Sequence, residues 1–251
     1  MSARSIEIFP VTRMPEIRPG DDVAGIIAAA IRKCRMHVRQ DDVFVVAQKI
    51  VSKAEGRIVE LASVSPSKRA ADWAAQWQKD RRQVEVVLRE TKRIVRMERG
   101  IIISETRHGF ICANAGVDAS NAPEGCVILL PENPDRSAEN LREKLALEFS
   151  APIGVIVSDT FGRPWRRGLT NVALGVAGIA PMLDHRGTPD QSGRTLHATV
   201  IAIADEIAAA AELVMGKAEG IPAAIVRGAQ PGNEGESGAD LIRDEASDLF
   251  R

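Results

Sequence analysis

The sequence predicts a mixed α/β fold, in which α and β elements (α+β) are interspersed along one chain. Short β-branched or alternating runs recur, apolar stripes of helical period lie between them, and neither repeats nor low-complexity segments break the order. The 251 residues, 45% of them hydrophobic, can bury one large core or two modest ones. We therefore expect a single domain over residues 1–251, divided into two lobes at most. Because Tyr is absent and only 4% of residues are aromatic, aliphatic side chains must fill the core.

The N-terminal part is expected to alternate strands with a helix. Residues 5–9 alternate apolar and polar side chains, which is typical of a half-buried strand. The acidic pair 21–22 is suited to cap a helix, and the apolar residues of 23–34 then fall on one stripe. The runs 43–47 and 58–61 predict two further strands, the first of them buried.

The middle of the chain is expected to hold a helix and several short strands. Ser65 and Pro66 predict a helix start, since Ser is a good cap and Pro is tolerated in the first turn. The runs 101–104 and 110–114 flank a His-Gly turn and predict a strand pair. Another strand is expected over 126–130, where a proline ends it.

The C-terminal part repeats the alternation. Ser137 is expected to cap a helix, and the continuous apolar run 153–158 predicts a buried strand that stops at Asp159. A strand over 196–203 is expected to run into a helix over 205–215. The remaining elements are a strand over 222–226, a Gly-rich loop over 231–238 and a charged last helix.

Charge and composition exclude several classes of protein. The 33 basic and 34 acidic residues give a net charge of -1, so we expect no nucleic acid partner. Cys34, Cys112 and Cys126 form no CxxC pair, and their odd number indicates free thiols in a reducing compartment. The N-terminus is unlike a signal peptide, and no apolar run reaches the ~20 residues of a membrane span. We therefore expect a soluble, cytoplasmic protein with no membrane partner.

The common catalytic signatures are missing from the sequence. It contains neither a GxxxxGK[ST] P-loop nor a GxGxxG fingerprint, and it lacks HExxH and GxSxG. Its four histidines are scattered without the spacing of metal ligands. The usual nucleotide-binding and hydrolase folds are therefore not indicated.

Polar residues follow two predicted strands at the points where the strands end. Asp118 and Asn121 follow one strand, and Asp159 with Thr160 follows another. Carboxylates at strand ends are well placed to hold Mg²⁺ or Mn²⁺ beside a phosphate, and two of them fit a two-metal clamp. The residues alone leave a second interpretation open, in which both aspartates only cap turns.

Basic residues near these strands suit anionic ligands. Arg163, Arg166 and Arg167 carry guanidinium forks that match carboxylates and phosphates, although a solvated basic turn has the same composition. Lys53 follows the 43–47 strand and is either a phosphate-binding charge or a surface lysine.

Several segments together resemble one family, the GTP-dependent coenzyme F420-0:L-glutamate ligases, also called gamma-glutamyl ligases. They keep the order and spacing of that family from about residue 5 to residue 228. The matching segments are AQKIVSKAEGR (47–57), NAGVDASN (114–121), SDTFGR (158–163) with WRRG (165–168), ADEIAAA (204–210), and MG (215–216) with GIP (220–222).

The resemblance implies roles for individual residues and a set of ions. Lys53, Asp118 and Asp159 would be catalytic, and Asp118, Asp159 and Thr160 would hold two divalent ions, Mg²⁺ or Mn²⁺, with K⁺ as an optional third ion. GTP would be the co-substrate. The positions that match guanine-nucleotide contacts are Met14, Pro15, Glu16, Ile17, Gln48, Lys53, Asn121, Met215, Gly216, Gly220 and Ile221.

The resemblance also implies a two-lobed protomer without a P-loop, assembled as an intertwined homodimer. A Gly/Ala-rich segment over 173–180 would permit close approach between elements of that dimer. Two positions depart from the family pattern. Gln48 stands where a Ser is frequent, and Lys217 stands where a metal-contacting amide or acid can occur. Because an ammonium group cannot ligate a metal, Lys217 is not a predicted ligand.

The activity implied is the addition of L-glutamate to coenzyme F420-0, a deazaflavin, first by an amide and then by a gamma-glutamyl linkage. An acyl phosphate would activate the acceptor carboxylate, and we assign Arg163, Arg166 and Arg167 to the anionic acceptor or to glutamate. Two alternatives stay open. The same scaffold could add glutamate to another acidic acceptor, or the chain could be a non-catalytic nucleotide-binding protein.

Overall fold

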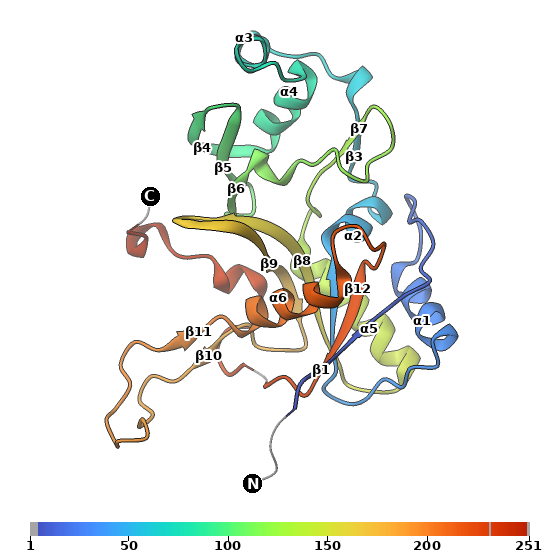
Figure 1. Ribbon diagram of the computed structural model, residues 1–251, viewed down its shortest axis with the longest axis vertical. Helices are drawn as coiled ribbons and strands as arrows, with labels where there is room; N and C mark the ends of the chain where they lie inside the picture. Colours follow the sequence, from blue (N-terminus) through green and yellow to red (C-terminus); the bar gives the residue numbers. More distant parts are fainter. Residues whose placement is uncertain (1–4, 231, 250–251) are drawn as a thin grey trace.

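The computed structural model describes residues 5–230 and 232–249 and has the mixed α/β architecture that the sequence predicts. A five-stranded sheet lies at its centre (Figure 1). β2 and β8 are parallel, and all other neighbours are antiparallel. From edge to edge the strands are β1 (Glu7–Pro10), β12 (Ala223–Arg227), β2 (Val43–Ala47), β8 (Gly154–Arg163) and β9 (Arg166–Ala177).

Both faces of this sheet are covered, which explains why its central strand β2 is apolar on every residue. Phe44 of β2 faces a cluster built with α1 (Val23–Lys33) and α5 (Pro134–Phe149). Its neighbour Val45 faces the opposite cluster, which α6 (Ile203–Met215) completes. Since helices close both faces, the carboxyl ends of β2 and β8 are left as the open edge of the sheet.

A second group of elements, above the sheet in Figure 1, is inserted between α2 (Gln48–Ala54) and α5. It has a hydrophobic cluster of its own, to which Val84, Ile102 and Val127 belong. This group comprises β3 (Ile58–Glu60), η1 (Leu61–Ser63), α3 (Lys68–Trp77), α4 (Arg81–Glu90), β4 (Thr91–Glu98), β5 (Ile101–Thr106), β6 (Ile111–Ala113), η2 (Asn114–Gly116) and β7 (Cys126–Ile128).

Two helices start at residues other than those predicted. The hydroxyl of Ser67, not Ser65, caps α3 by accepting a backbone N–H. α5 starts with Asn133 as cap and Pro134 in its first turn, so Ser137 lies inside the helix instead of capping it. No helix among residues 5–230 and 232–249 is long and apolar enough to cross a membrane.

The strand predicted to end at Asp159 continues to Arg163. It does so because β9 pairs with it along its whole length, from Val155 to the Arg163–Arg166 pair, and satisfies its backbone hydrogen bonds. The expected basic turn is therefore the tip of a long hairpin, which projects to the left in Figure 1.

Two C-terminal predictions are also wrong. The strand expected over 196–203 shortens to β11 (Val200–Ile201), which pairs with β10 (Leu183–Asp184) at the base of an arm at the lower left of Figure 1. The charged last helix does not form in the described part of the C-terminus, since its sequence has no continuous apolar stripe to bury. Only the turns η3 (Gly238–Leu241) and η4 (Glu245–Ser247) occur there, and Pro231 of the preceding loop lies outside the described residues.

The Gly/Ala-rich segment 173–180 makes its close approach within the chain. A Cβ on Gly175 would lie 2.2 Å from the carbonyl carbon and oxygen of Pro134, at the start of α5. The small residues therefore let α5 rest on β9. Because this close approach lies within one chain, the Gly/Ala-rich composition of the segment is no argument for a dimer. The dimer itself stays a proposal.

Candidate functional site

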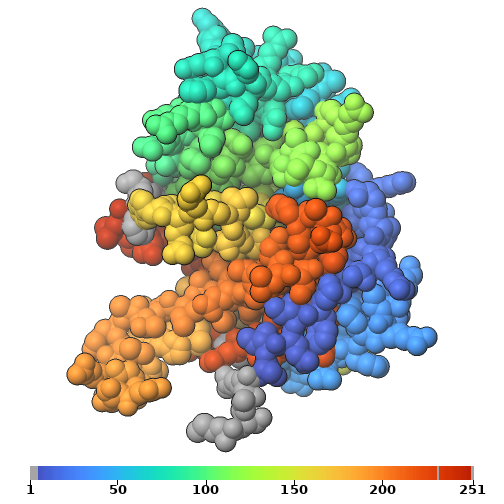
Figure 2. Space-filling view, viewed as in Figure 1, coloured from blue at the N-terminus to red at the C-terminus, as the bar shows by residue number. Residues whose placement is uncertain are grey.

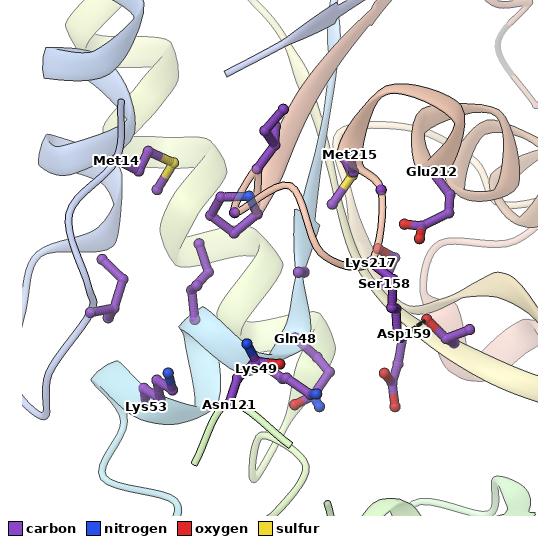
Figure 3. A pocket seen from close by; sticks show the side chains of 18 of the residues that line it. Met14, Gln48, Lys49, Lys53, Asn121, Ser158, Asp159, Glu212, Met215 and Lys217 are labelled. Carbon is purple, nitrogen blue, oxygen red and sulfur yellow. Dashed lines mark hydrogen bonds between the residues drawn. The ribbon is translucent and has the colours of Figure 1, made fainter. Parts of the chain in front are cut away.

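A cavity of about 360 Å³ lies where the parallel strands β2 and β8 end (Figure 3). The two ends are level, since Ala47 pairs with Ser158. α2 starts directly after β2, residues 14–17 pass on one side, and the loop after α6 closes the other side. In Figure 2 this loop is orange and lies below the light-green loop between η2 and β7. The carboxyl edge of such a sheet is the usual place for a ligand.

The structure brings together every residue predicted to contact the nucleotide. The predicted metal ligands Asp159 and Thr160 line the same cavity. These residues come from five separate parts of the chain, so the fold and not sequence proximity gathers them. The nucleotide-contact set on the wall is Met14, Pro15, Glu16, Ile17, Gln48, Lys53, Asn121, Met215, Gly216, Gly220 and Ile221.

The predicted arginine group is not part of this wall. Arg163, Arg166 and Arg167 lie at the exposed tip of the β8–β9 hairpin, and none of them lines the cavity. A ligand confined to the cavity would therefore not touch them.

Asp159 presents a half-buried carboxylate to the cavity and has no ion pair within 4 Å in the described part of the chain. Burial raises its pKa to about 6, although the backbone N–H of Thr160 and the ammonium groups of Lys217 and Lys49 act to lower it. The charge of Asp118 adds to the rise. A carboxylate with so little compensation is well suited to accept a cation.

Asp118 lies beside this wall and is already well compensated. Burial alone would raise its pKa, but hydrogen bonds from Lys49 and from the backbone and hydroxyl of Ser120 outweigh burial and lower it. Lys49 Nζ is 2.7 Å from Asp118 Oδ2. The Ser120 N–H donates to Oδ1 at 2.7 Å, and the Ser120 hydroxyl donates to Oδ2 at 2.8 Å. The turn-capping interpretation therefore describes Asp118 as it stands in this structure, and it does not describe Asp159.

A chain of hydrogen bonds that the sequence did not reveal fixes Thr160. Lys217 Nζ donates to Thr160 Oγ1 at 2.7 Å, and that hydroxyl donates to Asn171 Oδ1 at 2.8 Å. Asn171 Nδ2 in turn donates to Glu212 Oε2 at 3.0 Å. Asn171 faces Thr160 across the β8–β9 ladder, so a correct prediction of β9 would have placed it there. We found no sequence signal for Glu212 on α6.

The side chains present fit a divalent ion when a ligand shares its coordination. Carboxylates of Asp118 and Asp159 and the hydroxyl of Thr160 are the oxygen donors that Mg²⁺ and Mn²⁺ prefer. The described residues contain no cluster of three His, Cys, Asp or Glu side chains that could hold an ion alone. Phosphate oxygens would complete the shell, and the buried hydroxyl of Ser158, which has no hydrogen-bond partner among the described residues, lies on the same wall.

Comparisons with known proteins identify the family of this chain. The model of the F420-0:Gamma-glutamyl ligase family matches residues 12–228. The chain is 45% identical over 249 residues to the coenzyme F420:L-glutamate ligase of Methanothermobacter thermautotrophicus, covering 98% of this chain and 99% of that protein. It is 46% identical over 252 residues to the enzyme of the same name from Methanopyrus kandleri, covering 98% of each. The chain therefore belongs to the F420-0:gamma-glutamyl ligase family.

Proposed function

We propose that this protein is a ligase that joins L-glutamate to coenzyme F420-0 with GTP as the energy source. One observation carries the proposal. In a chain of this family, the residues expected to contact the nucleotide line a single cavity together with Asp159 and Thr160. The relatives that it matches over nearly their whole lengths are named coenzyme F420:L-glutamate ligases.

The charges on the cavity wall support a polyanionic ligand. Lys53 is almost fully buried, and its ammonium group pairs with the exposed carboxylate of Glu16. Lys49 and Lys217 add two more ammonium groups to the same wall. A triphosphate would be held by these charges, with Lys53 released from Glu16 toward it. Glu16 would then be free to accept hydrogen bonds from the base, and guanine offers N–H donors for that purpose.

Asp118 and Asp159 would hold the divalent metal, Mg²⁺ or Mn²⁺, at the phosphate end of the nucleotide, with Thr160 beside them. When bound there, the metal would neutralise charge that develops on the phosphates during transfer. Asp118 would have to exchange its contact with Lys49 for the metal. Asp159 needs no such exchange, because its carboxylate has no ion pair among the described residues.

The reaction proceeds by activation of a carboxylate, which is otherwise a poor electrophile for an amine. The free carboxylate of the acceptor attacks the γ-phosphorus of GTP, and the bond to GDP breaks. The α-amine of glutamate then attacks the acyl carbon, phosphate leaves, and the amine loses its proton. A second round would add a further glutamate through the γ-carboxyl. The wall residues position and compensate charge, and none needs to act as a nucleophile.

The exposed arginines would contact fewer parts of the substrates than the sequence suggested. Because Arg163, Arg166 and Arg167 lie outside the cavity, they can contact only a part of the acceptor that extends beyond it. The non-catalytic alternative is less well supported, since Asp159 keeps an uncompensated carboxylate that nucleotide binding alone does not need. Another acidic acceptor would use the same cavity, and only an assay distinguishes it.

The direct test is to incubate the purified protein with coenzyme F420-0, L-glutamate, GTP and Mg²⁺ or Mn²⁺ and to follow the product by mass spectrometry. The proposal expects the mass of one added glutamate and then of a second, together with GDP and phosphate. A parallel reaction with ATP tests nucleotide choice. No mass increase with any of these nucleotides and ions would refute the ligase function.

Lys53→Gln is expected to weaken GTP binding by about tenfold or more, or roughly 1.4 kcal/mol, because it removes a buried point charge from the phosphate region. The protein should stay folded, since the partner that it leaves unpaired, Glu16, is exposed to water. Isothermal titration calorimetry with GTP and Mg²⁺ measures the effect. Lys68→Gln, at an exposed position on α3, is the matched control and should bind GTP as the wild type does.

We also propose that two chains associate, and the hairpin tip supports this. Trp165 and Leu169 lie there and are 79% and 65% exposed, so the tip offers two large apolar side chains to a second chain. Light scattering at micromolar concentration is expected to give about 54 kDa, twice the chain mass of 27.1 kDa. A measured mass of one chain would contradict the dimer.

A further inference from the structure

Lys217 places a positive charge directly on a predicted metal ligand. Its Nζ lies 2.7 Å from Thr160 Oγ1, and its charge also reaches Asp159. Figure 3 shows Lys217 and Asp159 on the same side of the cavity, with Glu212 above them in this view, on α6. An ammonium group is a cation and a hydrogen-bond donor, and it cannot ligate a metal.

The hydrogen bonds of Thr160 favour this ammonium group over an ion. A hydroxyl has one hydrogen, and Thr160 donates it to Asn171, which is buried and fixed by Glu212. The lone pairs of Thr160 Oγ1 are thereby directed away from Asn171, and Lys217 occupies the acceptor side. A divalent ion bound to the same oxygen would lie within a few ångströms of the ammonium, where two positive charges repel each other strongly.

The negative charges of the site are also too few for two divalent ions. Lys49 and Ser120 already compensate Asp118. Glu212 accepts the hydrogen bond from Asn171. Asp159 and Glu212 are the carboxylates on this wall without an ion pair in the part of the chain described, and Glu212 is already engaged by the Asn171 amide. This arrangement provides for one divalent ion near Asp159 and for one ammonium group near Thr160.

We propose that Lys217 replaces a second divalent ion, so that the nucleotide-bound protein takes one divalent ion per chain instead of two. The proposal rests on the proposed function, since the nucleotide phosphates would lie between the ion and the ammonium group. Lys217 would contact a phosphate oxygen and supply a charge that does not depend on the metal concentration. Lys217 is therefore a positioning and charge-compensating residue for the nucleotide.

The test counts bound Mn²⁺ in the full-length protein, saturated with a non-hydrolysable GTP analogue, from the electron paramagnetic resonance signal of free Mn²⁺ during a titration. The wild type is expected to bind one Mn²⁺ per chain. Lys217→Gln is expected to bind two, because its amide oxygen is a possible ligand and the repelling charge is gone. Lys217→Arg and the distant Lys68→Gln should each bind one. All variants should fold, since both lysines are exposed.

The outcomes separate this inference from the proposed function. Two Mn²⁺ in the wild type would overturn the inference and leave the ligase proposal intact. One Mn²⁺ in both the wild type and Lys217→Gln would also overturn it, because Lys217 would then not determine how many divalent ions each chain binds. No bound Mn²⁺ in any variant would overturn the inference and the proposed metal site together, and glutamate addition measured by mass would then show whether the ligase activity survives without them.

Discussion

Asp159→Asn is expected to lower the ligation rate by roughly 10³-fold or more while the protein stays folded. The substitution keeps the size of the side chain and removes a carboxylate that has no ion pair among the described residues at the cavity. β8 is buried and paired on both sides up to this residue, so the carboxylate is held in place at the strand end. A phosphoryl transfer that depends on positioned charge cannot tolerate its loss. The rate of glutamate addition, measured by mass at fixed Mg²⁺, checks this.

The same variant is expected to be at least as stable as the wild type near pH 7.5 without metal and nucleotide. The folded-state pKa of Asp159, about 6, is above the ordinary value of an aspartate carboxyl, 3.8. Because the folded-state pKa is the higher of the two, protonation of this carboxyl stabilises the folded protein. Stability is highest where the carboxyl is protonated, and the wild type loses stability as the pH rises from about 4 to 6. Asn has no such loss, so the difference in free energy of unfolding should grow over this range, to at most about 3 kcal/mol. Thermal melts at pH 4.5 and 7.5 measure it.

Asp205→Asn is the matched control. Asp205 is also half-buried, and burial raises its pKa, but it accepts a hydrogen bond from the backbone of Ala173 and does not line the nucleotide cavity. It should keep ligation near the wild-type rate. If Asp159→Asn also kept near-wild-type ligation at the same metal concentration, the proposed metal role of Asp159 would be wrong.

Cavity residues could be predicted from the sequence where they directly follow a recognisable strand. Lys53 follows β2 and Asp159 follows the apolar run of β8, so strand ends indicated both, whereas Gln48 was predicted from the family resemblance. Asn171 and Lys217 could not be found in this way. Asn171 reaches the cavity through pairing with Thr160, and Lys217 through the path of a loop, and neither depends on a local pattern.

The fold was least predictable where the chain is polar. Residues 81–98 form α4 and β4, which the sequence did not predict, because half of their side chains are charged and few apolar residues mark a period. The prediction of where α5 starts was wrong for another reason. Asn133 and Ser137 are both good caps, and Pro134 decides between them because it is tolerated only in the first turn. The sequence could not place the arginine group relative to the cavity, because residues of a hairpin tip and of a binding wall have the same composition.

Gly175→Ala is expected to destabilise the protein by about 3 kcal/mol and to lower Tm by roughly 6–12 °C. The added Cβ would lie 2.2 Å from the Pro134 carbonyl and 2.5 Å from the Asp135 nitrogen, so α5 would have to move off β9. That movement would also stretch the hydrogen bonds that the Asp135 carboxylate accepts from Val176 and Gly238, at 2.9 and 2.6 Å.

Backbone cannot yield to this clash as a flexible side chain would, which is why the expected effect is large. Gly162→Ala, on the paired strand of the same hairpin, is the control, because its Cβ would meet only Leu169 at an ordinary 3.9 Å. Differential scanning calorimetry of the two variants beside the wild type gives the comparison. An unchanged Tm for Gly175→Ala would mean that α5 does not pack against β9 as described, whereas a drop confined to Gly175→Ala identifies the close approach as a packing requirement within one chain, independent of any partner.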